Sequence, residues 1–383
     1  MKWRRVKLGE ILESSKECRF VEHPLDEKLI SVQLHGKGAV QRVLSQEKAP
    51  SPFKGFVGRE GQIVYSRIWA RKGAIAKIGK DLDGVVVSSE FPLFNVCPVA
   101  DIDYLIYAFQ SSLFKQQLEL AGAGTSGQNR IKEKAFLNFE IPLPPLGEQK
   151  RIAEILGGAS KAINEIRTEI KRVESLCGAV VSLYAEDQST KKLEDLATLS
   201  GGLSLGSHRK NKPHSVRYLR VANVFWGKIL YDEIKELNCT DQEFERTLLQ
   251  DGDVLITEAH ANRFQVGRSA VFRGEEQALV FQNHLFRARP NKNIDSDVLA
   301  AMLSSVAVRR QLYQMAKTTS GLNTISISQV RSLRVPVLDT TKQAELLSFL
   351  QESNKLNHLL HRKLSLLQEL QKSLATRAFA GLL

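Results

Sequence analysis

With 383 residues, 43% of them hydrophobic and 25% charged, the chain is too long for one hydrophobic core, which serves roughly 250–300 residues, and too apolar for a disordered protein, so we expect at least two folded domains. No apolar run approaches the roughly 18 residues of a membrane-spanning helix, and no signal-peptide core follows the basic first residues, which predicts a cytoplasmic protein. The formal net charge of +12 favours a polyanionic partner, nucleic acid first, although solubility alone would also explain it.

The first half of the chain begins with roughly 140 residues of short β-type runs, among them 62–65 and 84–87, broken by glycine, proline and asparagine. A helical pattern follows from Asp103 to Leu120, where apolar residues recur every three or four positions. Two prolines at 144–145 end this region, because proline cannot join a helix interior. From Glu148 to Ala185 an apolar stripe with charged residues between its members predicts a coiled-coil helix about 57 Å long.

The second half follows the same plan. Its β-type runs include 253–256 and 278–281, and its helical pattern extends from Asp297 to Met315. An apolar stripe from Thr341 to Ala380 predicts a second long helix of about 60 Å. The polar Asn357 interrupts this stripe and is expected to set the register of the helix pair at a cost in stability.

The two stripes define the seam along which the long helices are expected to pack. The members that we single out are Ile152, Ile155, Ile163, Ile166, Ile170, Val173, Leu350, Leu360, Leu364, Leu367 and Leu374. Spacing of three and four residues in alternation is typical of a coiled coil. The charged residues on both sides of the seam are either a solvated face or a docking face for other subunits, and the pattern does not distinguish these two readings.

The chain also repeats itself. One shift of 194 residues carries three segments of the first half onto the second: 125–131 onto 319–325, 141–144 onto 335–338, and Gln149 onto Gln343. Nearly the same shift relates three further pairs upstream: 7–11 and 192–196, 61–64 and 252–255, and 91–94 and 283–286. Matches that keep one order indicate a tandem duplication rather than chance.

The expected fold class is therefore α+β, with two mixed α/β domains in tandem pseudo-repeat, separated by two long helices that form an antiparallel coiled coil. The expected boundaries are 1–146 for the first domain, 147–187 for the central helix, 188–338 for the second domain and 339–383 for the C-terminal helix. Antiparallel helices would present the two domains in inverted orientation, as a duplex with two half-sites requires, and would act as a ruler between them.

The repeated Thr-Ser-Gly segments are the sharpest local feature. Gly127 and Gly321 let the backbone approach a partner closely, and the neighbouring hydroxyl, amide and basic groups suit contacts with phosphates or bases. The alternative is a tight turn that serves folding only. The candidate DNA-binding residues of these segments are Ser126, Gln128, Asn129, Arg130, Lys132, Ser320 and Asn323.

A basic segment at 207–214 opens the second domain. It has no apolar period, so we expect it to bury no face and to be free to lie on a phosphate backbone, with solvated charge as the alternative. Its candidate DNA-binding residues are Arg209, Lys210 and Lys212.

Basic and amide side chains also follow equivalent strands in the two halves. Arg67, with Arg71 and Lys72, lies in the first half, and Asn262 with Arg263 lies in the second. We expect the two groups to face the same way. Arg67 and Arg263 are candidates for reading guanine, and Asn262 for adenine, because these side chains match the major-groove edges of those bases with two hydrogen bonds.

Enzyme signatures are missing from the sequence. It contains no phosphate-binding GxxxxGK loop, no HExxH, no GxSxG and no Asn/Asp-Pro-Pro-aromatic tetrapeptide of an adenine methyltransferase. The four cysteines are far apart and have no histidine at metal-ligand spacing, so we expect neither zinc nor a disulfide framework. The three tryptophans, Trp3, Trp69 and Trp226, are expected in the core or at domain edges rather than as base-stacking platforms. The chain is predicted to be non-catalytic, without cofactor or metal.

The segment 141–153, IPLPPLGEQKRIA, resembles the one that ends each target recognition domain and opens the spacer helix in specificity subunits of type I restriction-modification systems. The resemblance covers the whole chain, including its duplication, order and length. The second copy, 335–343, keeps one proline and Gln343 but lacks the Pro-Pro pair and the glutamate, which leaves the start of its helix open.

This resemblance implies that each target recognition domain reads one half of a bipartite site in double-stranded DNA, while the helices set the gap and dock two modification (methyltransferase) subunits. S-adenosylmethionine would bind to those subunits, and ATP and Mg²⁺ to the restriction (helicase-nuclease) subunits that complete a defence against foreign DNA. Because the two domains differ at most positions, we expect an asymmetric site. The alternatives are a stand-alone duplicated DNA-binding protein and the specificity subunit of a combined restriction-methylation enzyme.

Overall fold

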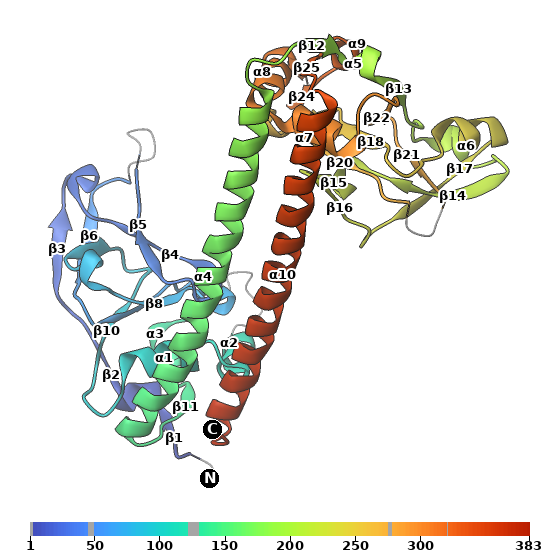
Figure 1. Ribbon diagram of the computed structural model, residues 1–383. Helices are drawn as coiled ribbons and strands as arrows, with labels where there is room; N and C mark the ends of the chain where they lie inside the picture. The colour runs from blue at the N-terminus through green and yellow to red at the C-terminus, as the bar shows by residue number, and fades with distance from the viewer. Residues whose placement is uncertain (1–2, 45–49, 122–129, 275–277, 320) are drawn as a thin grey trace. The chain divides into compact units, whose positions relative to one another are not determined.

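The computed structural model describes residues 3–44, 50–121, 130–274, 278–319 and 321–383 (Figure 1). The chain divides into two compact units. The first comprises Met1–Arg167 together with Arg362–Leu383, and the second comprises Thr168–His361. Each unit therefore combines a globular part with a stretch of each long helix.

The globular part of the first unit contains a four-stranded sheet and a three-stranded sheet. The first has the order β2 (Leu12–Ser14), β10 (Leu93–Val96), β7 (Ile63–Tyr65) and β8 (Ile75–Lys77), and the second β3 (Cys18–Val21), β6 (Phe53–Gly58) and β9 (Val85–Val87). Two small pairs join β4 (Ile30–Val32) to β5 (Ala39–Gln41) and β1 (Arg5–Lys7) to β11 (Glu140–Pro142). The helices are α1 (Ile102–Ala108), α2 (Ser112–Leu120) and α3 (Glu133–Leu137).

An aromatic cluster lies under the four-stranded sheet. Tyr65 stacks on Phe136 with ring centroids 4.2 Å apart, and Phe94 and Phe114 pack around the same ring. The Tyr65 hydroxyl donates to the backbone carbonyl of Ile131 at 3.0 Å, which satisfies its polar end inside the core. This bond attaches the segment before α3 to the end of β7.

The second unit repeats this architecture with additional strands. Its four-stranded sheet has the order β13 (Ala197–Gly201), β22 (Leu285–Pro290), β18 (Val254–Thr257) and β20 (Ser269–Val271), and a three-stranded sheet has β17 (Lys235–Cys239), β14 (His214–Leu219) and β21 (Leu279–Phe281). Smaller sheets contain β12 (Thr190–Lys192) with β25 (Arg334–Pro336), β15 (Val224–Phe225) with β16 (Lys228–Ile229), and β19 (Ala259–His260), β24 (Leu322–Thr324) and β23 (Lys317–Thr319). The helices are α5 (Leu193–Leu196), α6 (Asp241–Thr247), α7 (Ser296–Ser304), α8 (Val306–Met315) and α9 (Ile327–Arg331).

The two four-stranded sheets share one connection pattern, which confirms the tandem duplication and the α+β class. The helical patterns expected at 103–120 and 297–315 are each divided into two helices. Ser111 ends the first of these patterns locally, because its hydroxyl accepts the backbone N–H of Phe114 and caps α2. An apolar period of three to four residues continues across such a break, so periodicity alone does not reveal it.

The long helices are α4 (Leu146–Ala185) and α10 (Thr340–Phe379), each of 40 residues (Figure 1). Both lie within two residues of the sequence-based expectation. The start of α10, which the sequence left open, is capped by Asp339, whose carboxylate accepts the backbone N–H of Lys342 at 2.9 Å. The missing Pro-Pro pair is thus replaced by an ordinary helix cap.

The two helices run antiparallel in each unit. In the first, Gln371 donates to the Ser160 hydroxyl at 2.7 Å. In the second, the Tyr184 hydroxyl donates to Glu345 at 3.2 Å. The predicted seam residues are all buried or half-buried. Asn357 is half-buried and its side-chain oxygen has no hydrogen-bond partner, as expected of a polar residue that sets register at a cost in stability.

A glutamine near the start of each long helix fastens that helix to its globular part. The Gln149 side chain is fully buried; it accepts the backbone N–H of Asp101 at 2.8 Å and donates to the carbonyls of Val99 and Pro144 at 3.0 and 2.8 Å. Gln343 makes the equivalent bonds in the second unit with Asp295, Asn293 and Leu338. The repeated glutamine of the helix-entry motif therefore fixes the helix start against the loop before α1 or α7.

In the part of the chain that the structure describes, no helix is both long and apolar enough to cross a membrane. The same residues contain no group of three or more histidine, cysteine, aspartate or glutamate side chains that could hold a metal ion. The four cysteines are free thiols, and one of them, Cys239, is buried.

Candidate nucleic-acid interface

The end of the second strand of each repeat, β7 or β18, positions the first group of candidate residues. In the first unit, Arg67 donates its backbone N–H to the carbonyl of Glu90 and accepts the N–H of Ile131, at 3.0 and 2.8 Å. In the second unit, Glu258 makes the same two bonds, at 3.0 and 3.1 Å, with His284 and Ile325. Main-chain pairing therefore makes Arg67 equivalent to Glu258.

Arg67 and Arg263, the two candidates for reading guanine, therefore do not occupy matching positions of the two repeats. Arg263 lies in a 3-10 turn, η9 (Arg263–Gln265), and the corresponding turn of the first unit is η5 (Ala70–Lys72). The loop that contains η9 is longer than its counterpart, so a count of residues from the strand end misaligns the two.

The first unit places two crossed ion pairs at this strand end. The Arg67 guanidinium lies 3.5 Å from Glu133, and Arg130 lies 3.4 Å from Glu90. All four side chains are about one third to one half exposed. Arg67 Nε is buried without a hydrogen-bond partner in the described structure, and Glu90 Oε2, the oxygen that faces Arg130, is buried too. The group offers both donors and acceptors to an approaching ligand.

The second unit carries different chemistry at the same positions. His284 Nδ1 lies 2.6 Å from Glu258 Oε2, and Thr324 takes the place of Arg130. The arginine-rich group of one repeat is thus replaced by an acceptor carboxylate, an imidazole and a hydroxyl. Because equivalent backbone positions carry side chains of opposite charge, the two domains are suited to recognise different base edges.

The 3-10 turn of the first unit contains two more candidates. Arg71 donates to the carbonyls of Leu118 and Glu119, at 3.2 and 3.3 Å, and so caps the end of α2. Lys72 is exposed, with its ammonium 4.9 Å from the ring centroid of Trp69. Arg71 therefore shapes the turn, while Lys72 and Trp69 face outward.

In the second unit, candidate amides hold the loop after β19. Asn262 accepts the backbone N–H of Phe264 at 2.9 Å. Asn323 is buried and donates to the carbonyl of Ala261 at 2.9 Å. The Arg263 guanidinium lies over the ring of Tyr313, 4.3 Å from its centroid. Both asparagine side chains thus form hydrogen bonds within the loop, whereas the Arg263 guanidinium packs on an aromatic ring.

The basic segment at 207–214 differs from its expectation. Arg209 is only 7% exposed; it donates to the carbonyl of Asn238 at 3.0 Å and pairs with Glu243 at 3.2 Å. Lys212 pairs with the same carboxylate at 2.5 Å. The expectation that this segment buries no face and is free to lie on a phosphate backbone is therefore wrong for Arg209 and Lys212, because the start of α6 supplies an acidic partner. Lys210 is exposed.

Ser126, Gln128, Asn129 and Ser320 lie outside the described residues. Of the remaining candidates, Lys132 is exposed at the start of α3. The sequence interpretation missed three side chains beside the loop after β19: Phe264, Arg309 and Trp226, of which it placed Trp226 in the core or at a domain edge. Arg309 belongs to α8, so only the tertiary structure brings it to this loop.

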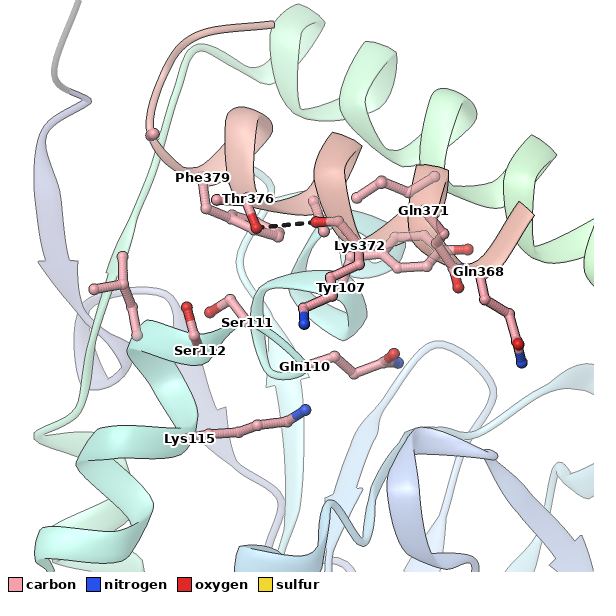
Figure 2. Close-up of a pocket in the computed structure, with 14 residues that line it drawn as sticks. Tyr107, Gln110, Ser111, Ser112, Lys115, Gln368, Gln371, Lys372, Thr376 and Phe379 are labelled. Carbon is pink, nitrogen blue, oxygen red and sulfur yellow. Dashed lines mark hydrogen bonds between the residues drawn. The ribbon is translucent and has the colours of Figure 1, made fainter. Parts of the chain in front are cut away.

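A cavity of about 510 Å³ lies in the first unit between α1, α2 and the last turns of α10. Figure 2 shows Lys115 and Gln110 on one side and Lys372 on the other. Thr376 donates its hydroxyl to the carbonyl of Lys372 at 2.9 Å. The described residues that line this cavity contribute amide, hydroxyl, ammonium and apolar groups and no carboxylate, thiol or imidazole.

Comparison with known proteins places these features in a family. Residues 1–175 match the family model of the type I restriction modification DNA specificity domain. The specificity subunit of the type I restriction enzyme EcoKI from Escherichia coli strain K12 is 27% identical over 303 residues, which cover 73% of this chain and 65% of that protein. The MjaVIII specificity subunit from Methanocaldococcus jannaschii is 24% identical over 258 residues, 61% of this chain and 59% of that one. The matching region thus spans less than two thirds of each relative.

Solved structures agree on the fold. A chain from a structure described for the complex assembly and conformational transition of the type I restriction-modification system has a TM-score of 0.61 at 20% identity, with 100% of this chain and 98% of that one covered. The S subunit from Mycoplasma genitalium has a TM-score of 0.53 at 15% identity, covering 99% and 96%. The chain is therefore similar in sequence to type I specificity subunits, its residues 1–175 match their DNA specificity domain, and it shares their fold.

Proposed function

We propose that this chain is the subunit that selects the DNA sequence on which a type I restriction-modification complex acts. Each globular part would read one half of a bipartite site, and the long helices would set the gap between the halves. The observation that carries this proposal is the equivalence of Arg67 and Glu258, which places opposite charges on matching backbone positions of two related domains. Two readers with opposite chemistry call for an asymmetric site.

The net charge of +12 supports a duplex as the ligand. Base readout additionally needs side chains held in fixed places, and the strand-end groups meet this need because main-chain bonds position both Arg67 and Glu258. One member of each group, Arg130 or Thr324, also lies three residues after the glycine of a repeated Thr-Ser-Gly segment. We therefore place the base-reading surface at these strand ends.

The proposed protein partners are two modification subunits, with restriction subunits joining them. Exposed leucines on the outer faces of the long helices support a docking role, since exposed apolar side chains at heptad spacing suit a partner helix. In the second unit they are Leu176, Leu183, Leu356 and Leu359, and in the first Leu366 and Leu370. S-adenosylmethionine, ATP and Mg²⁺ would bind to those partners. This chain would act on DNA in the cytoplasm without catalysis of its own.

Co-expression tests this proposal. The chain is produced with the methyltransferase subunit encoded beside it in a host that lacks DNA methylation, and modified adenines are mapped across the genome. One split, asymmetric motif that disappears when this chain is omitted is the expected result. DNA binding by the chain, together with a stable complex but no new methylation, would instead indicate a stand-alone DNA-binding protein.

A further inference from the structure

The loop after β19 holds a phenylalanine ring out in solvent. Phe264 is 65% exposed, although hydrogen bonds hold the backbone of its loop. Its backbone N–H donates to Asn262, its carbonyl accepts from the guanidinium of Arg309, and the same guanidinium donates to the carbonyl of Val266 at 2.7 Å. The backbone on both sides of the ring is therefore fixed by side chains from α8 and from the loop itself.

Further contacts hold the same loop from other directions. Trp226 donates its indole N–H to the side chain of Gln265 at 3.2 Å. The Phe264 ring stacks on Tyr313 of α8, with centroids 4.8 Å apart and planes inclined by 29°. A ring held in this way has little conformational freedom left to lose, so its contact with a ligand carries a small entropic cost. Exposed aromatic rings on a rigid support mark binding surfaces.

The surroundings of the ring are cationic. Segment 259–268 contains two arginines and one histidine but no acidic residue. Arg309 lies 4.2 Å from the ring centroid of Trp226. Among the described residues, no carboxylate forms an ion pair with Arg263, Arg268 or Arg309. Burial lowers the pKa of Arg309 to about 10, so it remains charged at neutral pH. Positive charge around a flat apolar ring complements a nucleic acid, which offers phosphates and base faces.

The first unit repeats this arrangement. The 3-10 turn η5 leaves Trp69 46% exposed, with Lys72 beside its ring and Arg71 fastening the turn to the end of α2. Ile68, next to the tryptophan, is also exposed. Two repeats that differ in most side chains thus each present an aromatic ring and a cation on the corresponding turn. The expectation that Trp69 serves only in packing leaves this exposure without an explanation.

We propose that Phe264 is an aromatic wedge that enters the duplex in the half-site read by the second domain and packs against base faces there. The ring opens one base step, while Arg263 and Arg309 beside it attract the flanking phosphates. Trp69 acts in the same way in the other half-site. This inference rests on the proposed function and adds a specificity mechanism, because base steps differ in how easily they unstack.

The test uses the complex of this chain with its co-expressed methyltransferase and a duplex that carries the split motif found by methylation mapping. The fluorescent base 2-aminopurine replaces one base at a time along the half-site. With the wild-type chain, fluorescence should rise severalfold at one base step in addition to the position of the methylated adenine, which the methyltransferase turns out of the duplex. Phe264→Ala should abolish this rise and weaken binding of the motif by roughly 10- to 100-fold, while binding of a random duplex changes less than twofold. Phe264→Leu, which keeps an apolar wedge, should retain part of the signal.

Phe20→Ala is the matched control, because Phe20 is 62% exposed and lies in β3 of the other unit. It should match the wild type, and thermal unfolding checks that both variants fold. Wild-type binding and fluorescence by Phe264→Ala would overturn the wedge and leave the proposed function intact. Loss of methyltransferase co-purification with unchanged DNA binding would also overturn it and assign the ring to a protein contact. If the wild-type chain directs methylation to no motif, the proposed function is contradicted, and the wedge, which rests on it, is contradicted as well.

Discussion

Arg67 and Glu258 occupy one position in the two repeats, since each accepts the backbone N–H of the equivalent isoleucine, Ile131 or Ile325, through its own carbonyl. The backbone hydrogen bonds are the same in both repeats, but the side chain is a guanidinium with five donors in the first repeat and an acceptor-only carboxylate in the second. A duplication that keeps the backbone and changes these side chains gives two domains of one fold that can recognise different bases.

The first prediction concerns specificity. Glu258→Gln exchanges an acceptor-only group for one that also donates, so the second domain should lose discrimination at one base of its half-site, by about 1–3 kcal/mol. Methylation mapping should then show a relaxed base in one half of the motif only. Arg67→Gln is the control in the equivalent position and should relax the other half. A change in both halves with either variant would mean that these residues act on the overall fold instead.

The second prediction concerns the helix-entry glutamine. Gln149→Ala removes the partners of three backbone groups, those of Asp101, Val99 and Pro144, and should lower the free energy of unfolding by about 2–4 kcal/mol. Urea unfolding measures the loss, and exchange of the Asp101 amide hydrogen should accelerate. Gln343→Ala should cost less, because its bonds of 3.0–3.3 Å lie at a partly exposed site. If both variants lost the same free energy of unfolding, burial of the glutamine would not explain the size of the loss.

The third prediction compares two versions of one partly buried contact. In the second unit, fully buried Asp253 binds Arg289 with two bonds of 2.7 and 2.8 Å. In the first, Gln62 donates to Asn95 at 2.8 Å at the matching strand positions. Asp253→Ala should lower the free energy of unfolding by about 3–5 kcal/mol, because it leaves Arg289 without its carboxylate.

The double variant Asp253→Gln with Arg289→Asn reproduces the neutral pair of the first unit. It should recover more than half of the stability lost in Asp253→Ala, as measured by urea unfolding. A double variant no more stable than the single one would show that the surroundings of Asp253 require a charged pair.

The sequence predicted the features that depend on local pattern. The long helices follow from a period of three and four residues, and their ends from prolines and caps, so α4 and α10 lie within two residues of expectation. Features that depend on distant partners were missed. Arg209 is buried because Glu243, 34 residues further on, neutralises it, and nothing in the basic segment itself signals that carboxylate. The equivalence of Arg67 with Glu258 was within reach of the sequence, because the shift that carries 61–64 onto 252–255 also carries Arg67 onto Glu258.

The last prediction follows from this carboxylate. Hydrogen bonds from Lys212, the Thr240 backbone and Arg209 lower the pKa of Glu243 to about 2. A carboxyl group whose pKa is lower in the folded chain than in the unfolded chain stabilises the fold above its unfolded pKa, near 4.3, and this contribution disappears as the pH falls towards 2. Wild-type stability should therefore decline between about pH 4.5 and pH 2, and Glu243→Gln should flatten the decline while lowering stability at neutral pH.

Unfolding by urea at a series of pH values measures both effects. Glu245→Gln is the matched control, because Glu245 is exposed on the same helix and forms no ion pair with the described residues around Arg209. It should keep the wild-type slope. If Glu243→Gln also keeps that slope, the acid sensitivity arises from other carboxylates, and the buried Arg209 is held by the carbonyl of Asn238 rather than by charge.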